Sequence, residues 1–188
     1  MKIHPKDVES RKQLILSLVK KDRQLRYCEV GTHEGTFADF MLHVNWDLHL
    51  TVVDPWIHQD VTQDASNVSD EEHQSAYEIC MGKFSQYKKK HPPVQVIRDF
   101  SLNAVKQFDD ETFDFVYLDS RHDYRSVYDD ISAWYPKVKR GGILAGHDYF
   151  YRNSRRNLVE VSIAVKDYFY NKEIFSTNES LPSWYVFK

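Results

Sequence analysis

A short segment near residue 30 constrains the fold of this chain more than any other. Residues 25–30 read as a buried strand, Gly31 and Gly35 form a tight turn, and a helix with an apolar face follows. Such a turn places backbone N–H groups and the positive end of a helix dipole at one point in space. In a parallel sheet that point lies at the carboxyl edge of the strands, where small ligands bind. The segment therefore predicts an α/β fold with a ligand site beside the turn.

The residues of the turn indicate which ligand it accepts. Glu29 lies two residues before Gly31, and His33 stands where the dinucleotide fingerprint has its middle glycine. An acid there disfavours a pyrophosphate but suits a ligand that carries an ammonium and a sulfonium group. S-adenosylmethionine is such a ligand. A nicotinamide-dependent oxidoreductase shares the strand, turn and helix, and is the less favoured alternative for the same reason.

The rest of the chain alternates between strand-like and helix-like segments. Further strands are predicted at residues 49–54, 94–98, 113–119 and 143–146, and short extended pieces at 173–176 and 184–187. Helices are predicted at residues 10–20, 71–90, 102–108, 124–135 and 155–170. This alternation predicts a mostly parallel sheet covered by helices on both faces. We expect one domain over residues 1–188, with a covering helix inside residues 1–22.

Four of the predicted strands end in acidic or polar residues. These residues are Glu29, Asp54, Asp119 and the pair His147–Asp148. Because the carboxyl ends of parallel strands meet at one edge, we expect these side chains to converge on one crevice. Asp54 stands about 20 residues beyond the glycine turn, where a ribose-binding acid is expected. Residues 56–70 are polar and aperiodic, which predicts a mobile lid over the crevice.

The composition excludes several classes of protein. A formal net charge of -3 over 188 residues gives no sign of a nucleic-acid or membrane partner. The basic run Lys88–His91 is most simply the solvated end of a helix. No apolar run is long enough to cross a bilayer, and the amino terminus lacks the apolar core of a signal peptide. Cys28 and Cys80 lie far apart, with Cys28 inside a buried strand, so we expect a cytoplasmic protein without disulfides.

The ordered set of motifs resembles the class I S-adenosylmethionine-dependent methyltransferases, and within them a small group close to the macrocin-type O-methyltransferases. The likeness covers about residues 25–188, and it is carried by residues 29–35, 53–56, 113–124, 130, 134, 141–149 and 182–185. It implies a Rossmann-like, doubly wound sheet of seven strands, with the last strand antiparallel and inserted beside the fifth. It also implies in-line transfer of a methyl group to an oxygen of a sugar or another small hydroxylated acceptor.

The resemblance assigns cofactor roles to the residues of the glycine turn. Glu29 and Gly31 would hold the methionine part of S-adenosylmethionine, with Thr32 and His33 beside them in the same turn. Gly35 would let the helix approach closely. The alternative is that Glu29 is a strand-end acid that caps the following helix, but the acid and the glycines together favour a cationic ligand.

The resemblance also places the other end of the cofactor. Asp54 would accept hydrogen bonds from the ribose hydroxyls, with Trp56 beside it. Asp99 and Phe100 would flank the adenine, although an acid shortly before a helix is also an ordinary N-cap. Asp119 would stand at the end where the methyl group is transferred.

The acceptor hydroxyl needs activation, because an alcohol is a poor nucleophile at neutral pH. Relatives in the family bind a divalent ion through three acids, and the matching positions here are Asp119, His147 and Asp148. A magnesium or manganese ion is therefore expected there, and the histidine favours an imidazole-tolerant metal. The alternative without a metal makes His147 or His122 the general base. A structural His122, bonded to Asp130 on the following helix, is a further alternative.

The acceptor itself is not readable from the sequence. Its pocket is expected between residues 56–70 and 149–157, walled in part by aromatic side chains. Residues 119–122 lack the Asn/Asp-Pro-Pro-aromatic turn that amino-methylating enzymes of nucleic acids share. A non-catalytic cofactor-binding module of the same fold remains an alternative. The first helix or exposed aromatic residues could support a homodimer.

Overall fold

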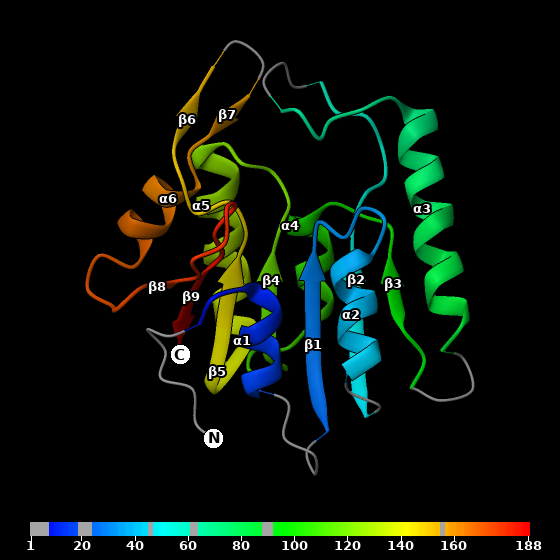
Figure 1. Ribbon diagram of the computed structural model, residues 1–188, viewed down its shortest axis with the longest axis horizontal. Coiled ribbons are helices and arrows are strands. Elements are labelled where there is room, and N and C mark those ends of the chain that lie inside the picture. Colours follow the sequence, from blue (N-terminus) through cyan, green and yellow to red (C-terminus); the bar gives the residue numbers. More distant parts are fainter. Residues whose placement is uncertain (1–7, 19–23, 45–46, 61–63, 88–91, 155–156) are drawn as a thin grey trace.

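Figure 1 shows the computed structural model, which describes residues 8–18, 24–44, 47–60, 64–87, 92–154 and 157–188. The described chain forms a seven-stranded sheet in the order β3-β2-β1-β4-β5-β9-β8. Its strands are β1 (Leu25–Val30), β2 (Leu48–Val53), β3 (Gln95–Ile97), β4 (Phe113–Leu118), β5 (Val138–Gly146), β8 (Phe175–Ser176) and β9 (Trp184–Phe187). Strands β1 to β5 are parallel, and β9 runs antiparallel between β5 and β8. The predicted sheet, with its inserted antiparallel last strand, is confirmed.

Helices cover both faces of the sheet because the side chains of each strand alternate between two apolar clusters. The helices are α1 (Arg11–Leu18), α2 (Thr36–Val44), α3 (Asp70–Ser85), α4 (Ser101–Ala104), α5 (Tyr124–Trp134) and α6 (Val161–Tyr168), with 3-10 turns η2 (Val105–Gln107) and η3 (Tyr135–Lys137). Helices α1 to α3 pack on the face that carries Tyr27 and Tyr117. Helices α4 to α6 pack on the face that carries Cys28 and Val116. Cys28 is fully buried there, as predicted.

The register of the strands brings their carboxyl ends to one edge. Val30 pairs with Val53 on one side and with Leu118 on the other, and Leu118 pairs with Gly146. The loops that follow β1, β2, β4 and β5 therefore begin side by side, at the upper edge of the sheet in Figure 1. This alignment is the physical basis of the predicted convergence of the strand-end acids.

Gly31 permits the close approach of β1 and β4 at this edge. Its φ is +86°, and a β-carbon at this position would lie 2.0 Å from the backbone oxygen of Asp119. Gly35, with φ +71°, faces helix α3, where a β-carbon would lie 2.7 Å from the Cys80 sulfur. Both positions therefore need glycine for their backbone conformation and for the space that their neighbours occupy.

The helix predicted over residues 155–170 is wrong in its first part. Two short strands, β6 (Arg152–Asn153) and β7 (Leu158–Val159), form an antiparallel hairpin, and α6 begins after it. Ser154 closes the hairpin, because its N–H donates to the Asn157 oxygen and its hydroxyl accepts from the Asn157 N–H. Such local side-chain bonds compete with helix formation. Residues 155–156 lie outside the described residues.

Helix α3 differs from its prediction at both ends. Ser69 and Glu72 form a capping box that starts the helix at Asp70, and the helix ends at Ser85. The predicted basic end at residues 88–91 lies outside the described residues. So do residues 1–7 and 19–22 around the covering helix α1, and residues 61–63 of the predicted lid. In the described part of the chain, each helix is too short or too polar to traverse a lipid bilayer.

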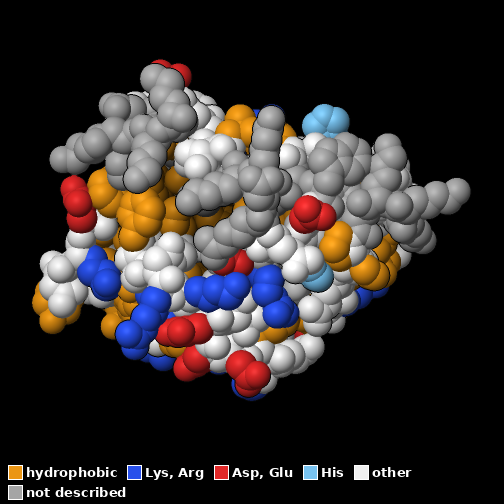
Figure 2. Space-filling view, turned by 90° about the horizontal axis from the view of Figure 1, so that it is seen from below, with side chains coloured by type: hydrophobic (Ala, Val, Ile, Leu, Met, Phe, Trp, Pro, Cys, Tyr) orange, Lys and Arg blue, Asp and Glu red, His pale blue; other side chains and the backbone are white. Residues whose placement is uncertain are grey.

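The opposite edge of the sheet, which Figure 2 views from below, carries lysine and arginine side chains with acids beside them. Three ion pairs lie there, Lys137–Asp110 at 2.7 Å, Lys139–Asp114 at 2.9 Å and Arg140–Glu111 at 3.3 Å. These cations are therefore neutralised by neighbouring carboxylates. The Lys137 and Arg140 pairs, whose acids are exposed, contribute little to stability, whereas Asp114 is buried.

Candidate active site

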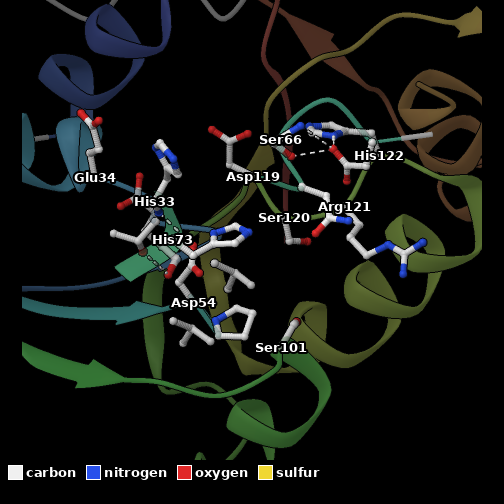
Figure 3. Close-up of a pocket in the computed structure, with 18 of the residues that line it drawn as sticks. His33, Glu34, Asp54, Ser66, His73, Ser101, Asp119, Ser120, Arg121 and His122 are labelled. Atoms are coloured by element: carbon white, nitrogen blue, oxygen red, sulfur yellow. Dashed lines mark hydrogen bonds and ion pairs between the residues drawn. The ribbon is translucent and has the colours of Figure 1, made fainter. Parts of the chain in front are cut away.

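A cavity of about 360 Å³ opens at the carboxyl edge of the sheet, beside the glycine turn (Figure 3). Strand-end acids from four different strands line it, namely Glu29, Asp54, Asp119 and Asp148. Gly31, Thr32 and His33 of the turn line it as well, whereas Gly35 stands behind them against α3. The predicted convergence of these residues on one crevice is therefore present in the fold.

Glu29 lies on the floor of the cavity and is 2% exposed. Its Oε2 atom is buried and has no hydrogen-bond partner among the described residues. Burial raises the pKa of this carboxyl well above its usual range, and the neighbouring charge of Asp119 adds to the effect. Arg11 acts in the opposite direction. A cationic group in the cavity would stabilise the ionised carboxylate of Glu29.

Asp54 holds the glycine turn through both of its carboxylate oxygens. Its Oδ2 accepts the backbone N–H of His33 at 2.8 Å, and its Oδ1 accepts that of Trp56 at 2.7 Å. Burial raises the pKa of Asp54, and these two hydrogen bonds counteract the rise. His33 and Trp56 have φ of 50° and 44°, a backbone conformation that non-glycine residues rarely adopt. The carboxylate therefore stabilises a strained turn and still presents lone pairs to the cavity.

Trp56 supports the turn from behind the cavity. It is 1% exposed, and its indole N–H donates to the His33 backbone oxygen at 2.9 Å. Its ring packs edge-on against Tyr77 of α3. The predicted contact of Trp56 with the ribose stays a prediction, since its side chain is occupied with the protein.

Asp99 and Phe100, which are predicted to hold the adenine, lie beside the cavity. The next residue, Ser101, lines it. Asp99 Oδ1 accepts the Phe100 N–H at 2.7 Å and the Asn103 side-chain amide at 3.1 Å. Phe100 is 48% exposed. Asp99 thus contacts the first turn of α4 through Asn103, but the N-cap residue is Phe100, so the alternative that Asp99 caps the helix is wrong. The adenine contact stays a prediction.

His73 is a residue of the site that sequence reasoning missed. It projects from α3 into the cavity and lies beside Asp54 (Figure 3). Both of its ring nitrogens are buried without a hydrogen-bond partner among the described residues. The helical spacing of apolar residues predicts which face of α3 packs on the protein. It does not predict that His73 of this helix reaches the cavity.

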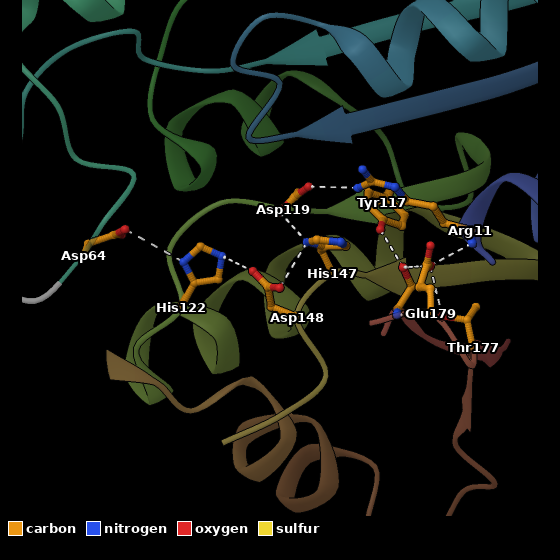
Figure 4. Close-up of polar contacts among 10 residues, drawn as sticks. Arg11, Asp64, Tyr117, Asp119, His122, His147, Asp148, Thr177 and Glu179 are labelled. Carbon is orange, nitrogen blue, oxygen red and sulfur yellow. Dashed lines mark hydrogen bonds and ion pairs between the residues drawn. The ribbon is translucent and has the colours of Figure 1, made fainter. Parts of the chain in front are cut away.

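The end of the cavity near β4 and β5 carries a chain in which carboxylates and imidazoles alternate (Figure 4). His122 Nε2 lies 3.1 Å from Asp148 Oδ2, and its Nδ1 lies 3.9 Å from Asp64 Oδ1. Asp148 Oδ1 lies 3.3 Å from His147 Nδ1, which in turn is 3.6 Å from Asp119 Oδ1. Five residues from three segments therefore form one electrostatic unit, which we call the transfer cluster.

The charges of the transfer cluster stabilise one another. Burial alone would lower the pKa of His122, but Asp148 and Asp64 outweigh burial and raise it to about 10. His122 and His147 hold the pKa of Asp148 well below its usual range despite its burial. Burial raises the pKa of Asp119, with partial compensation by His147, His122 and Arg11. His122 and Asp148 therefore face each other as an ion pair at neutral pH.

The predicted bond between His122 and Asp130 is wrong. Asp130 accepts hydrogen bonds from the hydroxyls of Ser101 and Ser120, both at 2.5 Å. The reason is that Asp123 caps α5 at its first turn and Asp130 then points to the buried side of that helix. His122 precedes the cap and remains in the loop, where it faces Asp148.

The transfer cluster offers a set of donors that fits a divalent ion. One ligand atom from each of Asp119, His122 and Asp148 lies within 4.8 Å of the other two. His122 Nε2 and Asp148 Oδ1 are buried, and their ion-pair contacts at 3.1 Å and 3.3 Å do not have hydrogen-bond geometry. Two carboxylates and one imidazole suit an ion that accepts nitrogen and oxygen ligands. This set contains His122 where the predicted set contained His147.

Arg11 and Asp64 also line the cavity, and sequence reasoning assigned them no role. Asp64 belongs to the predicted lid, whose described part is held by bonds from His58 to Asp70 and between Gln59 and Asn67. Its polar composition was the signal for a covering loop, but no signal told which of its residues would reach His122. Whether the loop moves stays a prediction.

The order of the sheet, its inserted antiparallel strand and the acid-lined cavity at the strand ends define the fold of the class I S-adenosylmethionine-dependent methyltransferases. Residues 28–149 match the family described as a methyltransferase domain. The chain belongs to this family. No curated protein matches its sequence.

Solved structures have the same fold at low sequence identity. A protein from Corynebacterium glutamicum has a TM-score of 0.65 and 14% identity, over 94% of this chain and 79% of that one. The O-methyltransferase NovP has a TM-score of 0.63 and 18% identity, over 94% and 77%. The O-methyltransferase TomG from Streptomyces achromogenes, in complex with SAM, has a TM-score of 0.61 and 11% identity, over 97% and 82%. At these identities the likeness establishes the fold.

Proposed function

We propose that the chain transfers the methyl group of S-adenosylmethionine to an oxygen of a sugar or another small hydroxylated acceptor. The observation that carries this proposal is the transfer cluster, since four of its members, Asp64, Asp119, His122 and Asp148, line the same cavity as Glu29 and Asp54. His147 stands behind them, within 3.6 Å of Asp119. Binding groups for a cationic nucleoside and charged groups for chemistry thus share one space. That NovP and TomG are O-methyltransferases of the same fold supports the choice of oxygen.

The cofactor would lie along the carboxyl edge of the sheet. Glu29 is the acid for its ammonium group, and Asp54 presents lone pairs to its ribose hydroxyls. The sulfonium and its methyl group then point toward Asp119. In-line displacement requires the acceptor oxygen, the methyl carbon and the sulfur to be aligned, so the protein contributes mainly by positioning them.

The loop over the cavity supports a hydroxylated acceptor. Gln59, Asp64, Ser66 and Asn67 line the cavity from this loop, and all four carry hydrogen-bonding side chains. Hydrogen bonds to hydroxyl groups are directional, and a site built for them discriminates strongly against analogues that lack them.

During transfer, a new carbon–oxygen bond forms, the carbon–sulfur bond breaks, and the acceptor hydroxyl loses its proton. A divalent ion held by Asp119, His122 and Asp148 would lower the pKa of that hydroxyl. In the alternative without an ion, His147 accepts the proton, or His122 does so after it has released the proton of its ion pair with Asp148. A neighbouring carboxylate stabilises the resulting imidazolium. Asp119 faces the cavity in both cases and stabilises positive charge near the sulfur.

Calorimetry with S-adenosylmethionine and S-adenosylhomocysteine tests the cofactor. We expect either ligand to stabilise the folded chain, by about 2.7 kcal/mol when its concentration is about 100 times its Kd. Tight binding of a nicotinamide cofactor, with no heat from either S-adenosyl compound, would end the proposal. Screening hydroxylated acceptors for methyl transfer then separates an enzyme from a non-catalytic binding module.

Chelation separates the two ways of activating the hydroxyl. If an ion is required, dialysis against a chelator abolishes turnover and manganese or magnesium restores it. If a histidine acts alone, turnover survives chelation, and His147→Ala or His122→Ala lowers it by about 100-fold. Cofactor binding, measured in the same samples, should change little in either case because the cofactor contacts lie at Glu29 and Asp54.

A further inference from the structure

We propose that Arg11 binds the carboxylate of the cofactor's amino-acid part, so that Arg11 and Glu29 together recognise an α-amino acid head group. The inference rests on the proposed function, because it concerns the same cofactor. Arg11 lies outside residues 28–149, which match the methyltransferase family. It is the first residue of α1 and lines the cavity.

The guanidinium of Arg11 faces the cavity without being fully engaged by the protein. Its side chain is 28% exposed, and its Cζ atom lies 5.0 Å from the centre of the Phe37 ring. Its Nη1 lies 3.5 Å from Asp119 Oδ2, which is longer than a charge-assisted hydrogen bond. The contact with Asp119 is thus a charge attraction, and the Tyr117 hydroxyl accepts a hydrogen bond from the guanidinium. Because a guanidinium carries five N–H donors, the others remain available to a ligand.

The backbone of Arg11 is fixed by the carboxyl-terminal part of the chain (Figure 4). The Arg11 N–H donates to Glu179 Oε1 at 2.8 Å. The same oxygen accepts the hydroxyls of Thr177 at 3.0 Å and Ser183 at 3.2 Å, and Ser183 also contacts the Tyr117 hydroxyl at 2.8 Å. The start of α1 is therefore anchored over β4 and β9, which preorganises the guanidinium above Asp119.

Arg11 and Glu29 act on the same small volume. The positive charge of Arg11 opposes the rise in the pKa of the Glu29 carboxyl, so the two groups interact electrostatically. An α-amino acid carries an ammonium and a carboxylate on one carbon, and an acid beside a guanidinium is their complement. A guanidinium fork also matches the geometry of a carboxylate, with two parallel hydrogen bonds.

The other arginine in the described lining of the cavity is Arg121, whose buried Nε has no hydrogen-bond partner among the described residues but whose Nη2 is paired. Arg121 lies 2.8 Å from Asp123 Oδ2. Lys83 of α3 donates to the Glu34 backbone oxygen and to the Thr36 hydroxyl, both at 2.9 Å. A carboxylate next to the ammonium-binding Glu29 therefore finds its guanidinium partner in Arg11.

A purely structural role for Arg11 is the competing explanation, in which its charge holds α1 on the sheet. Two ligands separate the roles. S-adenosylhomocysteine carries the amino-acid head group, whereas 5′-methylthioadenosine has the same nucleoside and thioether without it. A lost ligand contact weakens binding of the first compound alone, while a displaced helix weakens binding of both.

The experiment measures the Kd of both compounds by calorimetry for the full chain and for Arg11→Met. We expect binding of S-adenosylhomocysteine to weaken by about tenfold or more, and that of 5′-methylthioadenosine to change less than about twofold. Arg11→Lys should restore part of the loss. Lys12→Met is the matched control, because Lys12 lies 5.3 Å from the Phe40 ring on the next position of α1. It should leave both Kd values unchanged.

Equal weakening of both compounds in Arg11→Met, or no change in either, would overturn the proposal. If Arg11→Met does not fold, Arg11→Gln, which retains polar atoms, serves for the same comparison. Failure of the unaltered chain to bind either compound would refute the proposed function itself, and so is distinct from a failure of the Arg11 assignment.

Discussion

The two ends of the cavity are built in different ways. At the ribose end, the carboxylate of Asp54 is held by backbone N–H groups of His33 and Trp56. At the transfer end, side chains hold one another, with Asp148 between His122 and His147. The ribose end is therefore a backbone structure with one acid at its centre, whereas the transfer end is a set of mutually dependent charges.

This difference determines how each end of the cavity should respond to pH and to bound ions. Backbone donors keep their hydrogen atoms at all working pH values, so the ribose end should respond to pH through the Asp54 carboxyl alone and should not depend on bound ions. Charged side chains depend on protonation and on bound cations, so the transfer end should respond to both. Substitutions at the two ends should therefore differ in their effects on binding, turnover and pH response.

Gly31→Ala should disrupt both ends at once. The added β-carbon would lie 2.0 Å from the Asp119 backbone oxygen, at a φ that favours glycine. We expect the free energy of unfolding to fall by about 3 kcal/mol and cofactor binding to disappear. Gly82→Ala is the control, since Gly82 lies in α3 with nothing within 4 Å, and should stabilise by about 0.5–1 kcal/mol. Denaturant unfolding measures the free energy of unfolding of both variants. Similar changes in Gly31→Ala and Gly82→Ala would contradict the structure.

Asp119→Asn should damage the transfer end alone. The substitution keeps the shape of the side chain but removes the negative charge that faces Arg11 and His147. We expect turnover of a hydroxylated acceptor to fall by about 100-fold, and the Kd of S-adenosylhomocysteine to change less than about tenfold. Steady-state kinetics and calorimetry on the same preparation measure the two effects. Unchanged turnover would remove Asp119 from the chemistry.

Asp130→Asn should change the pH dependence of stability. Burial raises the pKa of Asp130 to about 6, although the Ser101 and Ser120 hydroxyls counteract it. Because the folded state holds this proton more tightly than the unfolded state, its stabilisation is fully present below the unfolded pKa and is lost as the pH rises through about 6. Between about pH 4.5 and about pH 7 the loss is about 2 kcal/mol.

The test is urea unfolding of both proteins at these two pH values. The Asp130→Asn variant should lack this part of the loss, while the contributions of other titrating groups cancel in the comparison. Parallel stability curves for the two proteins would show that the Asp130 carboxyl titrates alike in the folded and unfolded states.

Asp54→Asn should have the smallest effect and should confine it to binding. An amide keeps one acceptor for the N–H groups of His33 and Trp56 but loses the charge and the second acceptor. We expect the Kd of S-adenosylhomocysteine to rise about tenfold, with turnover at saturating cofactor nearly unchanged. Asp119→Asn should give the reverse pattern, so a loss of turnover in both variants would show that the two ends are not separate.

The sequence carried enough local information to predict the sheet and the shared edge. Gly31 and Gly35, the alternation of strands and helices, and acids at successive strand ends each report on a few neighbouring residues. Parallel strands then align their carboxyl ends without further information. Errors arose where a local bond competed with a pattern, as at the hairpin that Ser154 closes.

Contacts between distant segments were beyond such reasoning. The apolar positions of α1 indicate that it packs on the sheet, but not the rotation and height that bring Arg11 over Asp119. Likewise, the composition of residues 56–70 indicates a loop, but not that Asp64 lies near His122. The partner of a charged side chain is set by which surfaces come together, and these surfaces belong to residues far apart in the chain.

The sequence by itself thus determined the fold and the edge of the sheet at which Glu29, Asp54 and Asp119 gather, because backbone hydrogen bonding and side-chain alternation follow from short segments. Tertiary structure alone decided that His122 rather than His147 joins Asp119 and Asp148 as a set of donors, and that Arg11 faces the same cavity. Distances of a few ångströms between charges govern such pairings, and packing of whole helices and loops sets those distances.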